Sequence, residues 1–161
     1  MAKRNFKFKD IKIVGTHVKV EVDMSRFEKQ FQKAQYYLDS QVMTDMTPYM
    51  PRQTNTFINL VRARSAALAG SGVVIAAVPP YGRYLYEGKV MVDSVTGKGP
   101  MKIPDKHGGY VLRYRKGAKL VPTDRPLEYS NPQATPHWFD TAKERHGNKW
   151  IEETKQIAGG G

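Results

Sequence analysis

The sequence predicts an α+β fold in which a long helix in the N-terminal half packs on a small antiparallel sheet, with a long loop excursion and a C-terminal helix after it. Three patterns predict it. Apolar residues recur at three- and four-residue spacing from Phe27 to Val42, β-branched residues alternate with polar ones between Ile11 and Val22, and a second helical pattern begins near Trp138. We expect one domain over residues 1–158 and a flexible tail over residues 159–161.

Composition limits the classes of protein to which the chain can belong. Its 161 residues suffice for a core, and the absence of cysteine excludes a disulfide scaffold, a thiol nucleophile and any thiolate-ligated metal. The longest apolar run, residues 73–78, is far shorter than the roughly 20 residues that cross a bilayer. We therefore expect a soluble, unsecreted protein with no membrane partner.

The charge balance predicts an anionic partner. Twenty-six Lys and Arg residues against 15 Asp and Glu residues leave a net charge of +11, which favours polyanions or acidic protein surfaces. Residues 1–9 form a basic arm that we expect to be either mobile or docked on a neighbour. The candidate contacts with other subunits or with DNA are Lys3, Arg4, Lys7, Lys9, Arg83, Lys89, Arg113, Arg115, Lys116 and Lys119. A plainly solvated basic face is the alternative for these clusters.

The first half of the chain carries the clearest secondary-structure signals. The alternating residues before and after Gly15 are out of phase, which predicts a short hairpin or a bulged strand. Ser25 and Glu28 have the spacing of a capping box, so the long helix is expected to start there and to end before Pro48.

The pattern changes after Pro48. Thr54 or Thr56 is expected to cap a short helix that ends near Leu60. Residues 61–78 suit two antiparallel strands around a glycine turn at 70–72. A short helix over residues 81–87 is then expected to stop at Gly88.

Residues 88–134 are rich in glycine, proline and basic residues, and their periodicity is weak. A stretch of this length is either a functional loop excursion or a set of short strands, of which residues 109–114 are the best candidate. Thr135 and Pro136 are expected to open the C-terminal helix, which Gly147 could break or bend.

No catalytic or metal-binding pattern is found. The four histidines, at positions 17, 107, 137 and 146, form no ligand pair on one helix face, and no nucleophile motif or carboxylate pair stands out. We therefore expect no cofactor, no metal and no enzymatic activity. Tyr81, Tyr84 and Tyr86, beside Arg83 and Lys89, either form a packing face or stack on nucleic-acid bases.

Several segments together resemble a known family. They are Thr47-Pro-Tyr-Met-Pro51, Pro80-Tyr-Gly-Arg-Tyr-Leu-Tyr-Glu-Gly-Lys89, Thr123-Asp-Arg-Pro-Leu127 and Asn131-Pro-Gln-Ala-Thr-Pro-His-Trp-Phe139. In order and spacing they resemble the minor capsid proteins of long-tailed phages of Gram-positive bacteria, which are related to neck, head–tail connector and tail-completion proteins. The chain departs from the family at Gly82, where alanine is expected, and at Glu87, often aromatic in relatives.

The resemblance implies a structural virion protein without catalysis, which forms a ring in the neck between portal and tail tube. It implies a homo-oligomer, with six copies as the first expectation and twelve as the second. Other neck proteins would be partners: the portal, an adaptor or stopper, and a tail terminator or tail tube. The expected location is the virion neck, with the host cytoplasm during assembly, and phage DNA would be contacted weakly and without base readout. The alternative function is a basic nucleic-acid-binding module.

Overall fold

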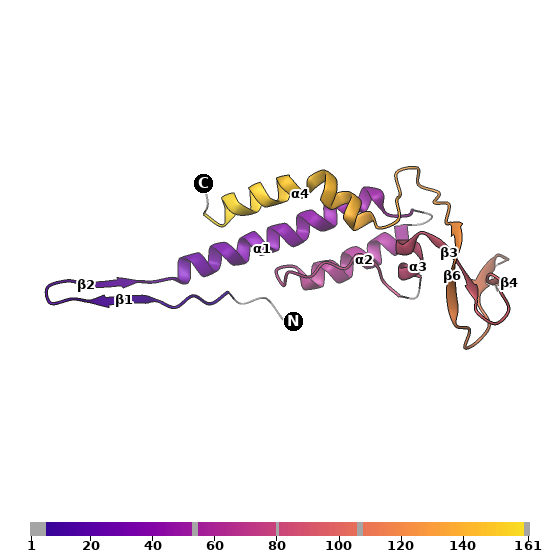
Figure 1. The fold of residues 1–161 in the computed structure, drawn as a ribbon, viewed down its shortest axis with the longest axis horizontal. Helices are drawn as coiled ribbons and strands as arrows, with labels where there is room; N and C mark the ends of the chain where they lie inside the picture. Colours follow the sequence, from indigo (N-terminus) through magenta and orange to yellow (C-terminus); the bar gives the residue numbers. More distant parts are fainter. Residues whose placement is uncertain (1–5, 53–54, 80, 106–107, 160–161) are drawn as a thin grey trace.

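The computed structural model describes residues 6–52, 55–79, 81–105 and 108–159. The chain is elongated, with a β-hairpin at one end, helices in the middle and small sheets at the other end (Figure 1). The predicted α+β class is confirmed, as are the long helix of the N-terminal half and the C-terminal helix. None of the helices in these described ranges is long and apolar enough to cross a membrane.

The N-terminal hairpin pairs β1 (Ile11–Val14) with β2 (Lys19–Val22), which is the first of the two predicted possibilities. The Gly15 N–H donates to the Val18 carbonyl oxygen at 2.7 Å and closes the turn. Ile11 lies opposite Val22, and Ile13 lies opposite Val20. The change of phase in the sequence therefore brings both apolar sets to the same face of the hairpin.

The long helix, α1, spans Ser25–Met46 and continues into a short 3₁₀ helix, η1, over Thr47–Tyr49. The predicted capping box is wrong. Both the N–H and the hydroxyl of Ser25 donate to the Asp23 carboxylate, at 2.8 and 3.0 Å, while Glu28 accepts the Phe8 N–H at 2.8 Å. The two side chains are therefore occupied by residues that precede the helix.

The strands predicted for residues 61–78 are also wrong. Helix α2 spans Asn55–Leu68, because Ile58, Val61 and Ser65 recur at helical spacing as its buried positions and the alanines between them favour a helix. Thr56 lies inside this helix, and Thr54 lies outside the described residues. Residues 73–78 are extended without strand pairing, and the Ser65 hydroxyl accepts the Ile75 N–H at 3.0 Å.

The C-terminal helix, α4, spans Trp138–Ile157 and begins two residues later than Pro136 predicted. Its N-cap is His137, in the left-handed region at φ +50°. Thr135 does not cap the helix, because its N–H donates to the Tyr49 carbonyl oxygen and its hydroxyl lies 2.9 Å from that of Thr141. Helix α4 continues through Gly147 without a break.

The core lies between helices and not between a helix and a sheet. Helix α1 packs chiefly on α4 and also on α2, so the predicted packing of the long helix on a sheet is corrected (Figure 1). The buried cluster comprises Val42, Met43, Met46, Met50, Ile58, Val61, Val78, Trp138, Ala142 and Trp150. Two indole N–H groups fasten it: that of Trp138 donates to the Ala76 carbonyl oxygen at 3.0 Å, and that of Trp150 to Asp45 at 2.7 Å.

The stretch between Gly88 and the C-terminal helix forms short strands, the second of the two predicted possibilities. It follows helix α3 (Gly82–Glu87). Strand β3 (Lys89–Asp93) pairs antiparallel with β6 (Leu120–Pro126), and β4 (Met101–Pro104) pairs antiparallel with β5 (Tyr110–Arg113). The β4–β5 hairpin is thus inserted between the two strands of the other pair.

Candidate interaction surfaces

Two of the motifs behind the family resemblance meet in one junction between α3 and the start of α4. Gly88 ends α3 in the left-handed conformation at φ +64°, and a Cβ there would lie 2.5 Å from Pro136 Cβ. The His137 N–H donates to the Tyr86 carbonyl oxygen at 2.8 Å, and the Tyr129 hydroxyl donates to that of Leu85 at 2.5 Å. These residues therefore position the sheets on the helical core.

The third motif, around η1, joins the same junction. The Asn131 amide donates to the carbonyl oxygens of Pro48 and Met50, each at 3.0 Å, and the Thr135 N–H donates to that of Tyr49 at 3.1 Å. These bonds satisfy carbonyl groups at the end of a helix, where the helix itself supplies no donor. These residues of the motifs are thus used for internal packing.

Close packing against Ala77 explains why position 82 is a glycine. A Cβ at Gly82 would lie 3.0 Å from both the Cβ and the carbonyl carbon of Ala77. Because this is tighter than ordinary van der Waals contact, alanine would push the extended segment away from α3. The departure of this chain from the family pattern therefore accompanies the close approach of residues 73–78 to the helix.

The tyrosines of α3 do not form a common stacking surface. Tyr86 is partly buried edge-on against the rings of Trp138 and His137, with centroids 4.8 and 4.9 Å apart. Its burial, with Asp140 nearby, raises the pKa of Tyr86 to about 12. Tyr81, the N-cap residue before α3, is exposed, and Tyr84 is half-buried. The structure thus places Tyr86 in the packing role.

Besides Arg115, seven of the candidate basic residues are exposed, and they lie on different elements or in the segments between them. Lys7 and Lys9 precede β1, Arg83 lies on α3, Lys89 begins β3, and Arg113 ends β5. Lys116 and Lys119 are also exposed, in the turn before β6 and at its edge. Lys3 and Arg4 lie outside the described residues. Several of these residues are close in the sequence, but the structure does not gather them in one pocket.

Arg115 differs from the other candidates because it has an internal partner. Its Nε donates to Asp93 Oδ2 at 3.0 Å and its Nη2 to Asp93 Oδ1 at 3.3 Å. The Asp93 carboxylate is buried and also accepts the Val95 N–H at 3.0 Å. The Arg115 hydrogen bonds, followed by that of Val95, hold the pKa of Asp93 below its usual range. The main role of Arg115 in this structure is therefore to hold the carboxylate at the end of strand β3.

The β1–β2 hairpin presents an exposed apolar surface, which the sequence pattern alone did not predict. Every strand residue of β1 and β2 is exposed. One face carries only the aliphatic side chains of Ile11, Ile13, Val20 and Val22, and Val18 in the turn is also exposed. Val14 is exposed on the other face, where it lies opposite Lys19. The opposite face carries Lys12 and Lys19, both within 3.4 Å of Glu21. Figure 1 shows this hairpin extending beyond the helices.

A second exposed hairpin lies at the other end of the molecule. All strand residues of β4 and β5 are exposed. Ile103 lies opposite Val111 on one face, next to Met101 and its partner Arg113. Exposed apolar patches on a folded protein mark interaction sites when they are contiguous. The two ends of the molecule therefore each present an uncovered strand pair.

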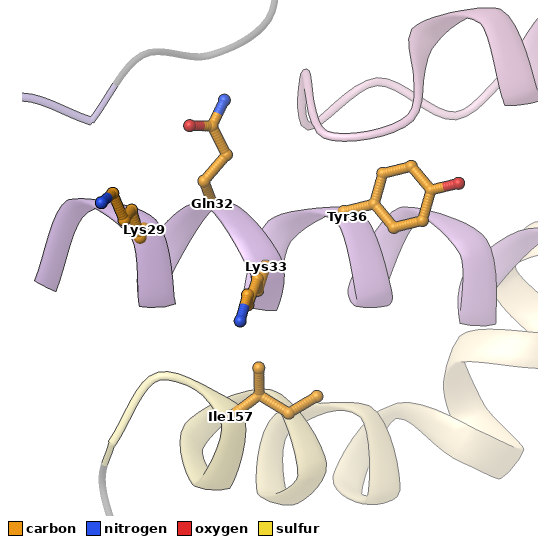
Figure 2. A pocket seen from close by; sticks show the side chains of 5 residues that line it. All are labelled: Lys29, Gln32, Lys33, Tyr36 and Ile157. Atoms are coloured by element: carbon orange, nitrogen blue, oxygen red, sulfur yellow. The ribbon is translucent and has the colours of Figure 1, made fainter. Parts of the chain in front are cut away.

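Two hollows on the described surface lie between helices. One, of about 570 Å³, lies between the start of α1 and the end of α4, and it is lined by Lys29, Gln32, Lys33, Tyr36 and Ile157 (Figure 2). Figure 2 shows Lys29, Gln32, Lys33 and Tyr36 spread along α1, with Ile157 on α4, and their polar ends do not converge on one point. In the described ranges, no three His, Asp or Glu side chains lie together as metal ligands.

A second hollow, of about 360 Å³, lies between α1 and α2. Its one carboxylate, Asp39, is buried and accepts the N–H groups of Gly70 and Gly72 at 2.8 and 3.0 Å, together with the Gln35 amide at 2.8 Å. These bonds hold the turn after α2 against α1. Asp39 thus has a structural role.

No family model, curated protein or solved structure matches this chain. The family resemblance therefore stays a prediction from the sequence motifs.

Proposed function

We propose that this chain is a structural virion protein of a tailed phage, which forms a ring in the neck between the portal or head and the tail tube, and through which DNA passes. The exposed strand pairs at both ends of the molecule carry this proposal. A two-stranded hairpin is marginally stable on its own in water, so an aliphatic face such as that of β1–β2 favours a protein partner.

The partners of this proposal are other copies of the chain and the adjoining neck rings. Six copies are the first choice and twelve the second. The portal, an adaptor or stopper, and a tail terminator or tail tube are the neighbours above and below. The location is the virion neck, reached from the host cytoplasm during assembly. Closed rotational symmetry repeats one contact around the ring, which makes a modest interface collectively stable.

A deletion experiment tests the proposal. A phage that lacks this gene should accumulate full heads and finished tails that do not join, as counted by negative-stain electron microscopy. Supplying the wild-type chain from a plasmid should restore joined particles, whereas a chain with Ile13→Lys and Val20→Lys should not. Joined, infectious particles formed in normal number without the chain would refute the neck function.

Binding to nucleic acid is the second candidate function. It is favoured by the exposed cations at the end of β5 and in the segment that follows it, namely Arg113, Lys116 and Lys119. A nucleic-acid-binding module should bind DNA or RNA with micromolar or tighter affinity that falls steeply between low and physiological salt. A neck subunit should bind weakly at either salt concentration. Fluorescence anisotropy with labelled single- and double-stranded DNA distinguishes the two.

A further inference from the structure

The two exposed hairpins match one another in size and chemistry. Each is an antiparallel pair of four-residue strands. On β1–β2, one face consists of Ile11, Ile13, Val20 and Val22, and no charged side chain interrupts it. On β4–β5, one face carries Met101, Ile103 and Val111, with Arg113 at its rim. Two apolar faces of equal strand length can pack on each other as the two layers of a small sandwich.

Their positions exclude contact within one chain. Figure 1 shows β1–β2 and β4–β5 at opposite ends of the long axis, separated by the helical core. Each face therefore needs a partner from outside the chain. Further copies of the chain supply both partners, because each copy exposes one hairpin of each kind. The β1–β2 face of one copy can meet the β4–β5 face of the next copy.

We infer that the aliphatic face of β1–β2 in one copy docks on the Ile103–Val111 face of β4–β5 in the next copy, head to tail. This inference specifies the subunit contact within the proposed ring, and it rests on the proposed function for the closure of that ring. It assigns the two ends of the subunit as the two halves of one interface.

Interface area favours this arrangement over a two-fold dimer. A stable protein–protein contact buries about 800 Å² on each partner, more than one four-residue hairpin face offers. A dimer formed by two β1–β2 hairpins would contain one such small contact and would leave both β4–β5 faces in water. In the head-to-tail arrangement each copy makes two contacts, one through each hairpin. Closure of the ring makes the binding free energies of these contacts act together.

Charge favours the same choice. Lys12 and Lys19 are already paired with Glu21 on the far face of β1–β2, so the docking face brings no unpaired cation to the basic end of the next copy. Packing two β4–β5 hairpins against each other would instead bring two Arg113 side chains together. Like charges facing each other across an interface are unfavourable.

Cysteine cross-linking tests the contact cleanly, because the natural chain contains no cysteine. Full-length chains with Ile13→Cys and with Ile103→Cys, carrying tags of different size, would be mixed at high concentration and treated with a short bis-maleimide. Cysteine is small and apolar, so both faces keep their character. The matched control is Ile151→Cys, on the exposed side of α4. Circular dichroism and urea midpoints equal to wild type would establish folding of each variant.

The expected result is a mixed dimer of Ile13→Cys with Ile103→Cys, in several-fold excess over the dimer of Ile13→Cys with Ile151→Cys. Self-linking of Ile13→Cys as the main product would overturn the inference in favour of a two-fold dimer. Equal linking to the control, no linking at all, or linking in infected cells only to a different protein would also overturn it. The deletion phage tests the neck function separately. If the purified chains cross-link as expected but the deletion phage still joins heads and tails normally, only the proposed function is rejected and the contact stands.

Discussion

At the scale of single residues, the close packing of Gly88 is the most demanding feature of the chain. Its φ of +64° lies in the region where a side chain is strained, and a Cβ would also meet Pro136 at 2.5 Å and the Tyr129 hydroxyl at 3.1 Å. Gly97 has nearly the same φ, +65°, but nothing lies within 4 Å of its Cβ position. Substitutions at Gly88 and Gly97 therefore allow the cost of backbone strain to be measured apart from the cost of steric overlap.

We predict that Gly97→Ala lowers the free energy of unfolding by about 1–2 kcal/mol, the cost of the left-handed backbone alone. Gly88→Ala should lower it by a further 1–3 kcal/mol or so, because the junction must also shift to admit the methyl group. Urea denaturation followed by circular dichroism measures both. Equal losses in the two variants would show that the junction of α3 with Pro136 is not tightly packed.

The Asp93–Arg115 pair predicts a pH dependence. Because the pKa of Asp93 is lowered in the folded chain, the pair stabilises the protein above the ordinary aspartate pKa of about 3.9, and this contribution is lost as the pH falls through the lowered value. We predict that Arg115→Met lowers the urea midpoint at pH 7, and that the difference from wild type shrinks as the pH falls below 4 or so.

Lys116→Met is the matched control for this pH prediction, since it removes the same charge from an exposed neighbour. Its effect on the urea midpoint should be small at neutral pH. A difference between wild type and Arg115→Met that is the same at neutral and acid pH would contradict the assignment of Asp93 as the titrating partner.

At the scale of elements, the sequence predicted the parts whose pattern is local. The apolar stripe of α1, the hairpin around Gly15, the helix stop at Gly88 and the strand over residues 110–113 all depend on spacing and turn chemistry within a few residues. Residues 61–78 were mistaken for strands, because alanine and β-branched residues alone do not distinguish a helix from a strand. The helix is settled by the burial of Val61 and Ser65 against other elements.

The candidate site was less predictable than the fold. Charged residues could be named from the sequence, but Arg115 was found to be bound to Asp93, and that contact joins residues far apart in the chain. The exposure of the aliphatic face of β1–β2 could not be foreseen either. An alternating pattern predicts that one face is apolar, yet whether another element covers that face depends on the complete fold.

Hydrogen exchange tests whether the β1–β2 hairpin is incomplete in the isolated subunit. Since a lone hairpin is marginal in water, we predict that its amides exchange within about tenfold of an unstructured chain, whereas amides of α1 and α4 near the core are slowed by orders of magnitude. In assembled particles the hairpin amides should become protected. Strong protection of β1–β2 in a dilute monomer would contradict the need for a partner.

At the scale of the whole molecule, the described chain has a packed helical centre with an uncovered strand pair at each end (Figure 1). Such a shape suits a subunit that contacts one neighbour on each side, and it leaves the net charge of +11 available for acidic ring partners or DNA phosphates. The junction of the three motifs then has a mechanical role. In the proposed ring, this junction would hold the two exposed ends of the subunit at a constant orientation, which a ring of identical subunits requires.

The most direct test of the neck function is the position of the chain in the particle. A functional chain with a C-terminal epitope tag would replace the natural one, and purified particles would be labelled with gold-conjugated antibody and imaged by electron microscopy. We predict gold at the junction of head and tail, in particles that remain infectious. Gold elsewhere on the particle, or purified particles that do not contain the chain, would contradict a ring in the neck.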